Sequence, residues 1–255
     1  GASSISVPQR IVDAFYMVDG RDINNSSAKY PYENSPYDKN CIVQENKILS
    51  LNYTLQAGTY KAYANREPRF YTTVSYNGSW YALAERKFEF FKNQKDNDYT
   101  HDAPQNGYLV RKKVYSQDNP KNGSYKWRQM FLYRLAASYL DYAEAVNEAY
   151  DNRASREDAL KYVNKVRERA GVRQYTLDAV AADDAKYIHV DDNQLAVREA
   201  VRMERRVELC CEGSRWSDIR RWKIVEQLPE MCGDDYGMNF AGINSQEFYK
   251  RTVFQ

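Results

Sequence analysis

Residues 204–222 read ERRVELCCEGSRWSDIRRW, the stretch with the highest density of charge in this chain. It holds four acids, five arginines and two tryptophans in nineteen residues. Upstream, Val197 and Val201 lead into Glu204 and Glu208 at steps of four, so one helical face begins apolar and then carries two carboxylates. These carboxylates need positive partners, and we predict a structural network of ion pairs with the arginines of the same stretch.

The stretch also predicts two helices that meet at a sharp corner. Gly213 is typical of the end of a helix, and Ser214 can cap the next one. Arginines lie on both sides of this corner, at Arg205, Arg206, Arg215, Arg220 and Arg221. We assign structural roles to Glu204, Glu208, Arg215, Asp218 and Arg220.

Written as a pattern, the stretch is ER-x-x-EL-x-x-EG-x-R-x-x-D-x-RRW. This pattern resembles the late signature of the SusD/RagB family, the surface glycan-binding lipoproteins of Bacteroidetes starch-utilisation systems. Three further segments resemble family segments in the family's order: NREPRFYTTVSYNGSWY (65–81), RLAASYLDYAEAVNEAY (134–150) and ALKYVNKVRERAGV (159–172). The chain departs from the family pattern at Glu67, where aspartate is usual, and at Ala137, where glutamate is usual.

The resemblance implies a SusD-like, mostly α fold of tetratricopeptide-like helical hairpins, with long irregular loops and a small β-hairpin region. We expect a loop-rich region over 1–124, a helical region over 125–228 and an irregular tail over 229–255. Family members are longer than this chain, so we expect the N-terminal half of the fold to be absent from it and to pack against it. The resemblance also implies a lipid anchor at the extracellular face of the outer membrane.

The helical region carries evidence of its own. Ala143, Val146 and Tyr150 are followed by apolar positions in 159–166 at steps of 3, 4, 9, 4 and 3, which is typical of a tetratricopeptide hairpin. We place the start of its long helix near Tyr125. Ser155 with Asp158 predicts a capping box for the second helix, and Gly171 predicts its end. One such hairpin cannot bury its apolar face alone and must stack on others.

A β-hairpin is predicted earlier in the chain. Residues 70–76 alternate in character, Asn77-Gly78 is the strongest short turn signal, and 79–82 begins a second arm. Residues 107–115 predict a further strand, with basic side chains.

Aromatic residues are unusually abundant, with 23 tyrosines and 9 phenylalanines against a mean hydropathy of −0.81. We therefore expect many tyrosines at the surface or in a cleft. Rings on proline-stiffened loops, such as the loop with Pro31 and Pro36, lose little entropy on binding and offer flat faces to sugar rings. The candidate ligand-binding residues are Trp80, Tyr81, Tyr37, Tyr32 and Tyr76. Each ring has the alternative role of packing a loop against a helix.

Other classes of protein and site are disfavoured. The net charge of +2, with acids and bases interspersed, argues against nucleic-acid binding. No apolar run is long enough for a transmembrane helix.

The four cysteines form no C-x-x-C pair and lack companion histidines, so we predict reduced cysteines, no metal and no cofactor. The acidic segment 183–192 lacks the spacing of a calcium loop and predicts a solvated loop that ends in a helix cap at Asp191, Asp192 or Asn193.

Catalysis is also disfavoured. Glu204 and Glu208 could in principle form the carboxylate pair of a glycosidase, but neighbouring arginines lower carboxyl pKa values, and an acid catalyst needs a raised one. We predict a binding protein that captures oligosaccharides and delivers them to a TonB-dependent SusC-like transporter. Two alternatives stay open, a peptide-binding nutrient receptor of the same family and a glycoside hydrolase.

Overall fold

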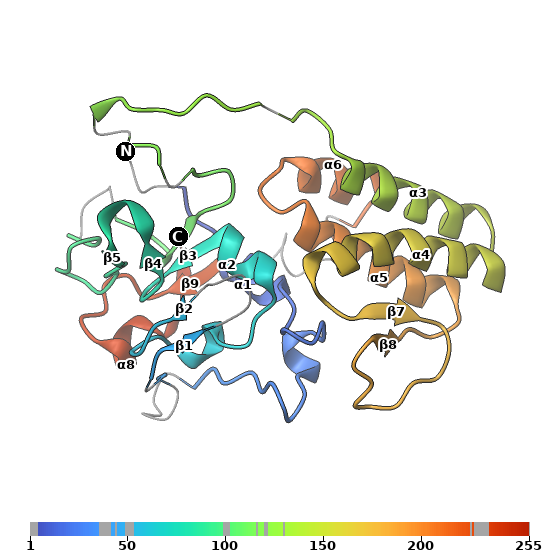
Figure 1. The fold of residues 1–255 in the computed structure, drawn as a ribbon, viewed down its shortest axis with the longest axis horizontal. Helices are drawn as coiled ribbons and strands as arrows, with labels where there is room; N and C mark the ends of the chain where they lie inside the picture. Colours follow the sequence, from blue (N-terminus) through green and yellow to red (C-terminus); the bar gives the residue numbers. More distant parts are fainter. Residues whose placement is uncertain are drawn as a thin grey trace.

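The computed structural model describes residues 5–35, 42–43, 45–48, 54–98, 103–115, 117–119, 122–129, 131–224, 226 and 235–254. These residues form two lobes (Figure 1). A helical lobe contains α3 to α6, and a loop lobe contains α1, α2, α8 and most of the short strands. The segment that leads into α3 crosses from one lobe to the other along the edge of the molecule. The fold is mostly helical, as predicted.

The helical lobe is built from a hairpin and a third helix that packs on both of its arms. Its elements are α3 (Leu135–Ala149), α4 (Arg153–Ala170), α5 (Gln194–Glu208) and α6 (Ser214–Arg221), with β7 (Gln174–Thr176) paired in parallel to β8 (Tyr187–His189). Leu140, Ala143, Val163 and Val197 are completely buried in its core. The predicted hairpin of helices is confirmed.

The loop lobe has short elements around an aromatic core. Its helices are α1 (Gln9–Ala14), α2 (Pro68–Thr73) and α8 (Ser245–Phe248), with 3-10 turns at Ile23–Asn25, Lys61–Tyr63 and Ala82–Ala84. Its antiparallel pairs are β1 (Lys47–Ile48) with β2 (Thr54–Leu55), β3 (Val74–Tyr76) with β6 (Tyr108–Val110), β4 (Trp80–Tyr81) with β5 (Arg86–Lys87), and β9 (Asp235–Met238) with β10 (Arg251–Phe254).

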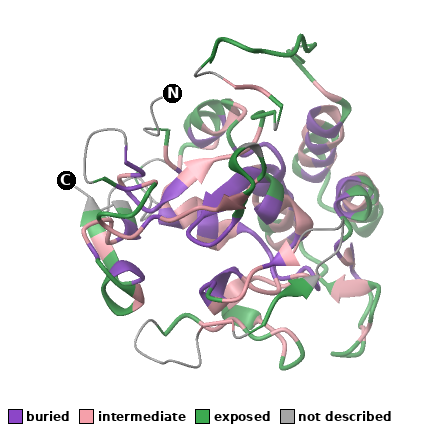
Figure 2. Cartoon of the chain, turned by 60° about the vertical axis from the view of Figure 1, so that its left-hand side comes forward, coloured by how far each residue is buried: buried purple, intermediate pink, exposed green. Residues whose placement is uncertain are grey.

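Tyrosines build this core instead of lying only at the surface. The ring of Tyr63 contacts the rings of Tyr76 and Tyr108 at centroid distances of 4.4 and 6.0 Å. The buried hydroxyls are hydrogen-bonded, because Tyr63 donates to Tyr108 at 3.2 Å and Tyr108 donates to Gln9 at 2.8 Å. Buried residues fill the centre of both lobes in Figure 2. Other tyrosines do lie at the surface, as expected, among them Tyr125 and Tyr150, which are 66% and 62% exposed.

The predicted hairpin at Asn77-Gly78 is wrong in its pairing, although the turn itself forms. Residues 68–73 are helical, because Pro68 occupies the first turn of α2, where its missing N–H costs nothing. The Ser79 N–H then donates to the Tyr76 carbonyl at 2.9 Å, which closes the turn. Strand β3 pairs with the distant β6, and β4 pairs with β5, so the turn joins two different sheets.

Of three predicted helix ends, two differ in the structure and one is confirmed. Helix α3 begins at Leu135 and not near Tyr125, because 125–129 is extended and exposed, and a helix without a packed face is marginal. Asn152, not Ser155, caps α4, accepting from the Ser155 N–H at 2.9 Å. Gly171 ends α4 in the left-handed conformation, φ 72°, as predicted.

At the corner, the two predicted helices form, but their ends differ in detail. Helix α5 already ends at Glu208, and Cys211 and Gly213 both have left-handed backbones, with φ of 60° and 86°. Ser214 is the first residue of α6 and provides no side-chain cap. Asn193 caps α5, which agrees with the predicted cap after the acidic segment. Within the described residues, the helices are too short or too polar to cross a bilayer.

Candidate functional site

Glu204 lies at the centre of a buried ion-pair network between the two lobes. Its side chain is fully buried, and so is that of Arg167 on α4. Arg167 Nη1 donates to Glu204 Oε2 at 2.8 Å, and Arg69 Nη1 of α2 donates to Glu204 Oε1 at 2.6 Å. The Glu204 carboxylate therefore joins one helix of the loop lobe to two helices of the helical lobe.

Glu208, one turn further along α5, continues this network. Arg69 Nη1 donates to Glu208 Oε2 at 2.9 Å, and Arg134 and Arg169 both donate to Glu208 Oε1. Burial alone would raise the pKa of Glu208, but the charges of these arginines outweigh burial and lower it. A carboxylate held ionised in this way is a structural anion and unsuited to act as a general acid.

The partners of these two acids are not the ones that the sequence predicts. Arg69, Arg134, Arg167 and Arg169 come from 35 or more positions away in sequence, whereas the arginines of the stretch itself serve other groups. Asp218 does pair locally, accepting from Arg205 Nε at 2.7 Å and from Arg221.

Arg215 and Arg220 lie over aromatic rings. The Arg215 guanidinium is 5.8 Å from the Trp222 ring centroid, and that of Arg220 is 5.6 Å from the Trp216 ring centroid. The sharp corner turns α6 relative to α5, so proximity in sequence does not bring these side chains to Glu204. Their structural role stays a prediction.

The structure describes four of the five predicted ligand-binding residues, and these four differ in exposure. Trp80 is 40% exposed on β4, and Tyr81 beside it is half-buried, with its ring stacked on Phe88 at 4.6 Å. Tyr32 is half-buried, with the Arg66 guanidinium 5.5 Å from its ring centroid. Tyr37 lies outside the described residues.

Tyr76 is a correction to the predicted site. It is completely buried, and its ring stacks on Phe70 at 5.4 Å in the core of the loop lobe. The ring has no free face for a ligand because the turn at Asn77-Gly78 directs β3 into the core instead of into an exposed hairpin.

An open groove of about 430 Å³, which we call the Tyr30 groove, lies where the end of α4 meets the loop before Pro31. Its lining is polar and apolar in equal measure and includes one aromatic ring. The residues that matter to its chemistry are Asp19, Lys29, Tyr30, Glu168, Arg173 and Lys186. This arrangement offers hydrogen-bond donors and acceptors of both charges next to a flat face.

Hydrogen bonds to a buried carboxylate and within the backbone fix the loop that carries Tyr30. The Asp19 carboxylate, only 5% exposed, accepts from Ser27 Oγ at 2.7 Å. The Ser27 carbonyl in turn accepts from the Tyr30 N–H at 3.0 Å. The loop is therefore tied to the wall of the groove, which places the Tyr30 ring before any ligand arrives.

Sequence reasoning did not single out the Tyr30 groove. Tyr30-Pro31 shares the aromatic, proline-containing loop of Tyr32, so the loop gave a usable signal. Glu168 and Arg173 gave no such signal in the sequence, because they come next to this loop only through contacts between segments more than a hundred residues apart.

Comparison with known proteins identifies the family. The family model described as the SusD family matches residues 1–253. The chain belongs to the SusD family.

Solved structures agree in fold. BT4246 is 24% identical with a TM-score of 0.70, and the match covers 97% of this chain and 40% of that one. A SusD-like protein from Bacteroides fragilis, BF3747, is 25% identical with a TM-score of 0.65 over 97% of this chain and 41% of that one. A SusD-like carbohydrate binding protein from the same species, BF0978, is 21% identical with a TM-score of 0.56 over 90% and 37%.

The chain thus spans about 40% of the length of the SusD-like structures that it matches. A search of curated proteins found no match.

The network predicts a large cost for removing its central carboxylate. Glu204→Gln should lower the free energy of unfolding by about 3–5 kcal/mol, because it leaves the buried Arg167 without its counter-charge. Urea unfolding followed by circular dichroism measures this. The matched control is Glu148→Gln, which breaks the partly exposed pair with Arg198 and should cost about 0–1 kcal/mol. Equal costs for the two variants would contradict the central role of Glu204.

The lowered pKa of Glu208 predicts a dependence of stability on pH. A carboxyl group whose pKa is lower in the folded than in the unfolded chain contributes stability above its ordinary pKa of 4.5, and this stability is lost as the pH falls through the folded value. The free energy of unfolding should therefore fall as the pH is lowered below about 5. Urea titrations at several pH values measure this, and in Glu208→Gln the free energy of unfolding should fall less steeply at low pH. An equally steep fall in the variant and in the unsubstituted protein would count against the assignment.

Proposed function

We propose that the Tyr30 groove binds an oligosaccharide. A groove of about 430 Å³ is within the usual range of small-molecule sites, roughly 300–1,000 Å³. Carboxylate, ammonium and guanidinium groups suit the hydroxyls of a sugar, and the Tyr30 ring suits the C–H face of a pyranose. The polar groove beside a tyrosine held in place, in a chain of the SusD family, is the observation that carries the proposal.

The comparisons support this proposal through one relative. BF0978 is described as a carbohydrate binding protein, and its fold resembles that of this chain. Trp80 and Tyr81 on the β4–β5 hairpin are proposed as a second stacking surface, since Trp80 is the more exposed of the two rings.

Binding without covalent chemistry is part of the proposal. The carboxylates of Glu204 and Glu208 are occupied by arginines, so this pair is unavailable to a glycosidase mechanism. Among the described residues, no group of three or more His, Cys, Asp or Glu side chains could hold a metal ion.

We further propose that the protein acts at the outer face of the outer membrane and passes its ligand to a TonB-dependent SusC-like transporter. The remaining part of the SusD fold is proposed to cover the apolar surface around the start of α3. Trp127 and Leu132, in the segment before α3, are 85% and 90% exposed, and Leu135 is also exposed. Burying these side chains against another helical layer would remove a large apolar surface from water.

Tyr30→Ala tests the groove. The dissociation constant for a bound oligosaccharide should rise about tenfold, equivalent to about 1.4 kcal/mol, because the stacking face is lost while the polar lining stays. Isothermal titration against panels of neutral and acidic oligosaccharides and of peptides measures this. Tyr150→Ala, which removes an exposed tyrosine at the end of α3, is the matched control and should change nothing. Binding of peptides but no sugar would reject the proposal in favour of a peptide receptor.

Trp80→Ala tests the second surface separately. We expect affinity to fall between about twofold and tenfold, in line with about 0.5–1.5 kcal/mol for one aromatic stacking contact. Trp216→Ala on α6 is the control, because Trp216 is also exposed, at 61%, but lies in the helical lobe. An unchanged affinity in Trp80→Ala would remove the hairpin from the site and leave the groove alone.

A further inference from the structure

Cys210 and Cys211 form a pair of thiols at the corner between α5 and α6. Their sulfur atoms are 3.4 Å apart, and neither is in a disulfide. Cys210 is buried and Cys211 is exposed, so the pair reaches from the interior to solvent. Adjacent side chains on a regular helix point away from each other, but the left-handed backbone of Cys211, φ 60°, brings the two sulfurs together here.

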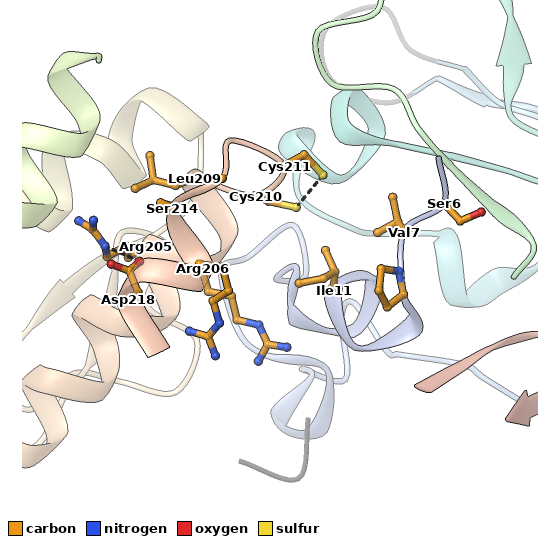
Figure 3. Close-up of a pocket in the computed structure, with 13 residues that line it drawn as sticks. Ser6, Val7, Ile11, Arg205, Arg206, Leu209, Cys210, Cys211, Ser214 and Asp218 are labelled. Atoms are coloured by element: carbon orange, nitrogen blue, oxygen red, sulfur yellow. Dashed lines mark hydrogen bonds and ion pairs between the residues drawn. The ribbon is translucent and has the colours of Figure 1, made fainter. Parts of the chain in front are cut away.

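Both sulfurs line a small cavity (Figure 3). Its volume is about 100 Å³, and apolar side chains of Val7, Ile11 and Leu209 form part of its wall. This volume is well below the roughly 300 Å³ of a typical ligand pocket, so the cavity suits an ion or a group of a few atoms and excludes a sugar ring.

Positive charge lies close to the pair. Lys112 Nζ donates to the Glu208 carbonyl at 2.8 Å and pairs with Glu212 at 2.6 Å, which holds the ammonium beside the corner. A hydrogen bond with the Cys210 thiol, together with the charges of Lys112 and Lys113, lowers the pKa of Cys211 to about 7. The same hydrogen bond and burial raise the pKa of Cys210. The Cys211 thiol is therefore about half ionised near neutral pH, beside the un-ionised Cys210 thiol.

A disulfide between these two residues is disfavoured by geometry. Consecutive Cα atoms across a trans peptide are about 3.8 Å apart, whereas disulfides usually join Cα atoms about 4.4–6.8 Å apart. The described peptide bonds are all trans. The pair is therefore held in the dithiol form, in which both sulfurs are free to bind something else.

We propose that Cys210 and Cys211 together bind a soft, three-coordinate ion, with trivalent arsenic as its best-fitting class. Bonds of about 2.3 Å to sulfurs 3.4 Å apart enclose an angle of about 95° at the ion. This angle is typical of a pyramidal centre such as trivalent arsenic, while a tetrahedral ion such as zinc would need the sulfurs about 3.8 Å apart.

The third position belongs to hydroxide, because no third His, Cys, Asp or Glu in the described part of the chain completes a ligand set. Arsenous acid reacts with the two thiols to form two As–S bonds. Two As–O bonds break, and the two hydroxyls leave with the thiol protons as two water molecules. One hydroxyl stays on arsenic, and no atom changes its oxidation state.

Arsenite itself is the probe. The double variant Cys41→Ser/Cys232→Ser removes the two cysteines outside the described residues and leaves only the pair. Thiol titration of this variant should find two free thiols, and intact-mass spectrometry with arsenite should find one adduct that gains AsOH and loses two hydrogens. Failure to find the thiols, or two free thiols that form no adduct, would overturn the proposal.

Single substitutions then test whether both sulfurs act together. In the same background, Cys211→Ser and Cys210→Ser should each weaken arsenite binding at least about tenfold, because a chelate loses its second, effectively intramolecular contact. Arsenite should also raise the melting temperature of the two-thiol variant and leave that of Cys211→Ser unchanged. Cys211 is exposed, so Cys211→Ser still tests chelation if Cys210→Ser fails to fold. Unchanged affinity in Cys211→Ser would disprove chelation.

Discussion

The fold depends on the charge of two carboxylates that have been removed from water. An isolated carboxylate in the interior is costly, and its charge is tolerated only when cations and hydrogen bonds replace its hydration. Glu204 and Glu208 obtain these cations from α2, from the residue before α3 and from α4. Three segments that are distant from α5 in sequence are therefore constrained to meet at this helix.

Helix α5 also joins the two hydrophobic cores. Val197 and Val201 belong to the core of the helical lobe, while Val207 and Cys210 belong to that of the loop lobe. The charged turn between them lies where one core passes into the other. An apolar side chain at position 204 would fill the space, but it would leave Arg167 without its counter-charge, while Arg69 would keep Glu67 and Glu208 as partners.

For residues 204–222, the sequence predicts correctly that two helices form, but it does not predict which arginines pair with the acids. Steps of four along α5 and the glycine at the corner are local signals, and both helices form. The identity of the arginines is not a local property, because Arg69 and Arg134 reach Glu208 only after the chain has folded across 139 and 74 positions.

The same limit explains why the pairing of the predicted hairpin is wrong. Asn77-Gly78 specifies a turn, but not whether β3 pairs with its neighbour or with β6. The prediction for Tyr76 is wrong for the same reason, because its strand β3 pairs with β6 and buries the ring in the core of the loop lobe.

Arg167 connects this framework to the Tyr30 groove. Besides Glu204, its guanidinium donates to the Arg173 carbonyl at 2.6 Å and to the Gly20 carbonyl at 3.2 Å. Gly20 and Arg173 belong to the two backbone segments that border the groove, next to Asp19 and Gln174.

The rings of Tyr16 and Tyr175 lie on the same guanidinium, at 4.8 and 3.8 Å, so it has little freedom to move. Gly20 has to be glycine here, since its φ is 80° and a Cβ would lie 2.8 Å from Arg167 Nη2. The buried charge at Glu204 therefore sets the spacing of the groove walls although no atom of Glu204 lines the groove. The residues that line the groove and the acids of the ion-pair network are different, but the Arg167 guanidinium bonds to both regions and so links their positions.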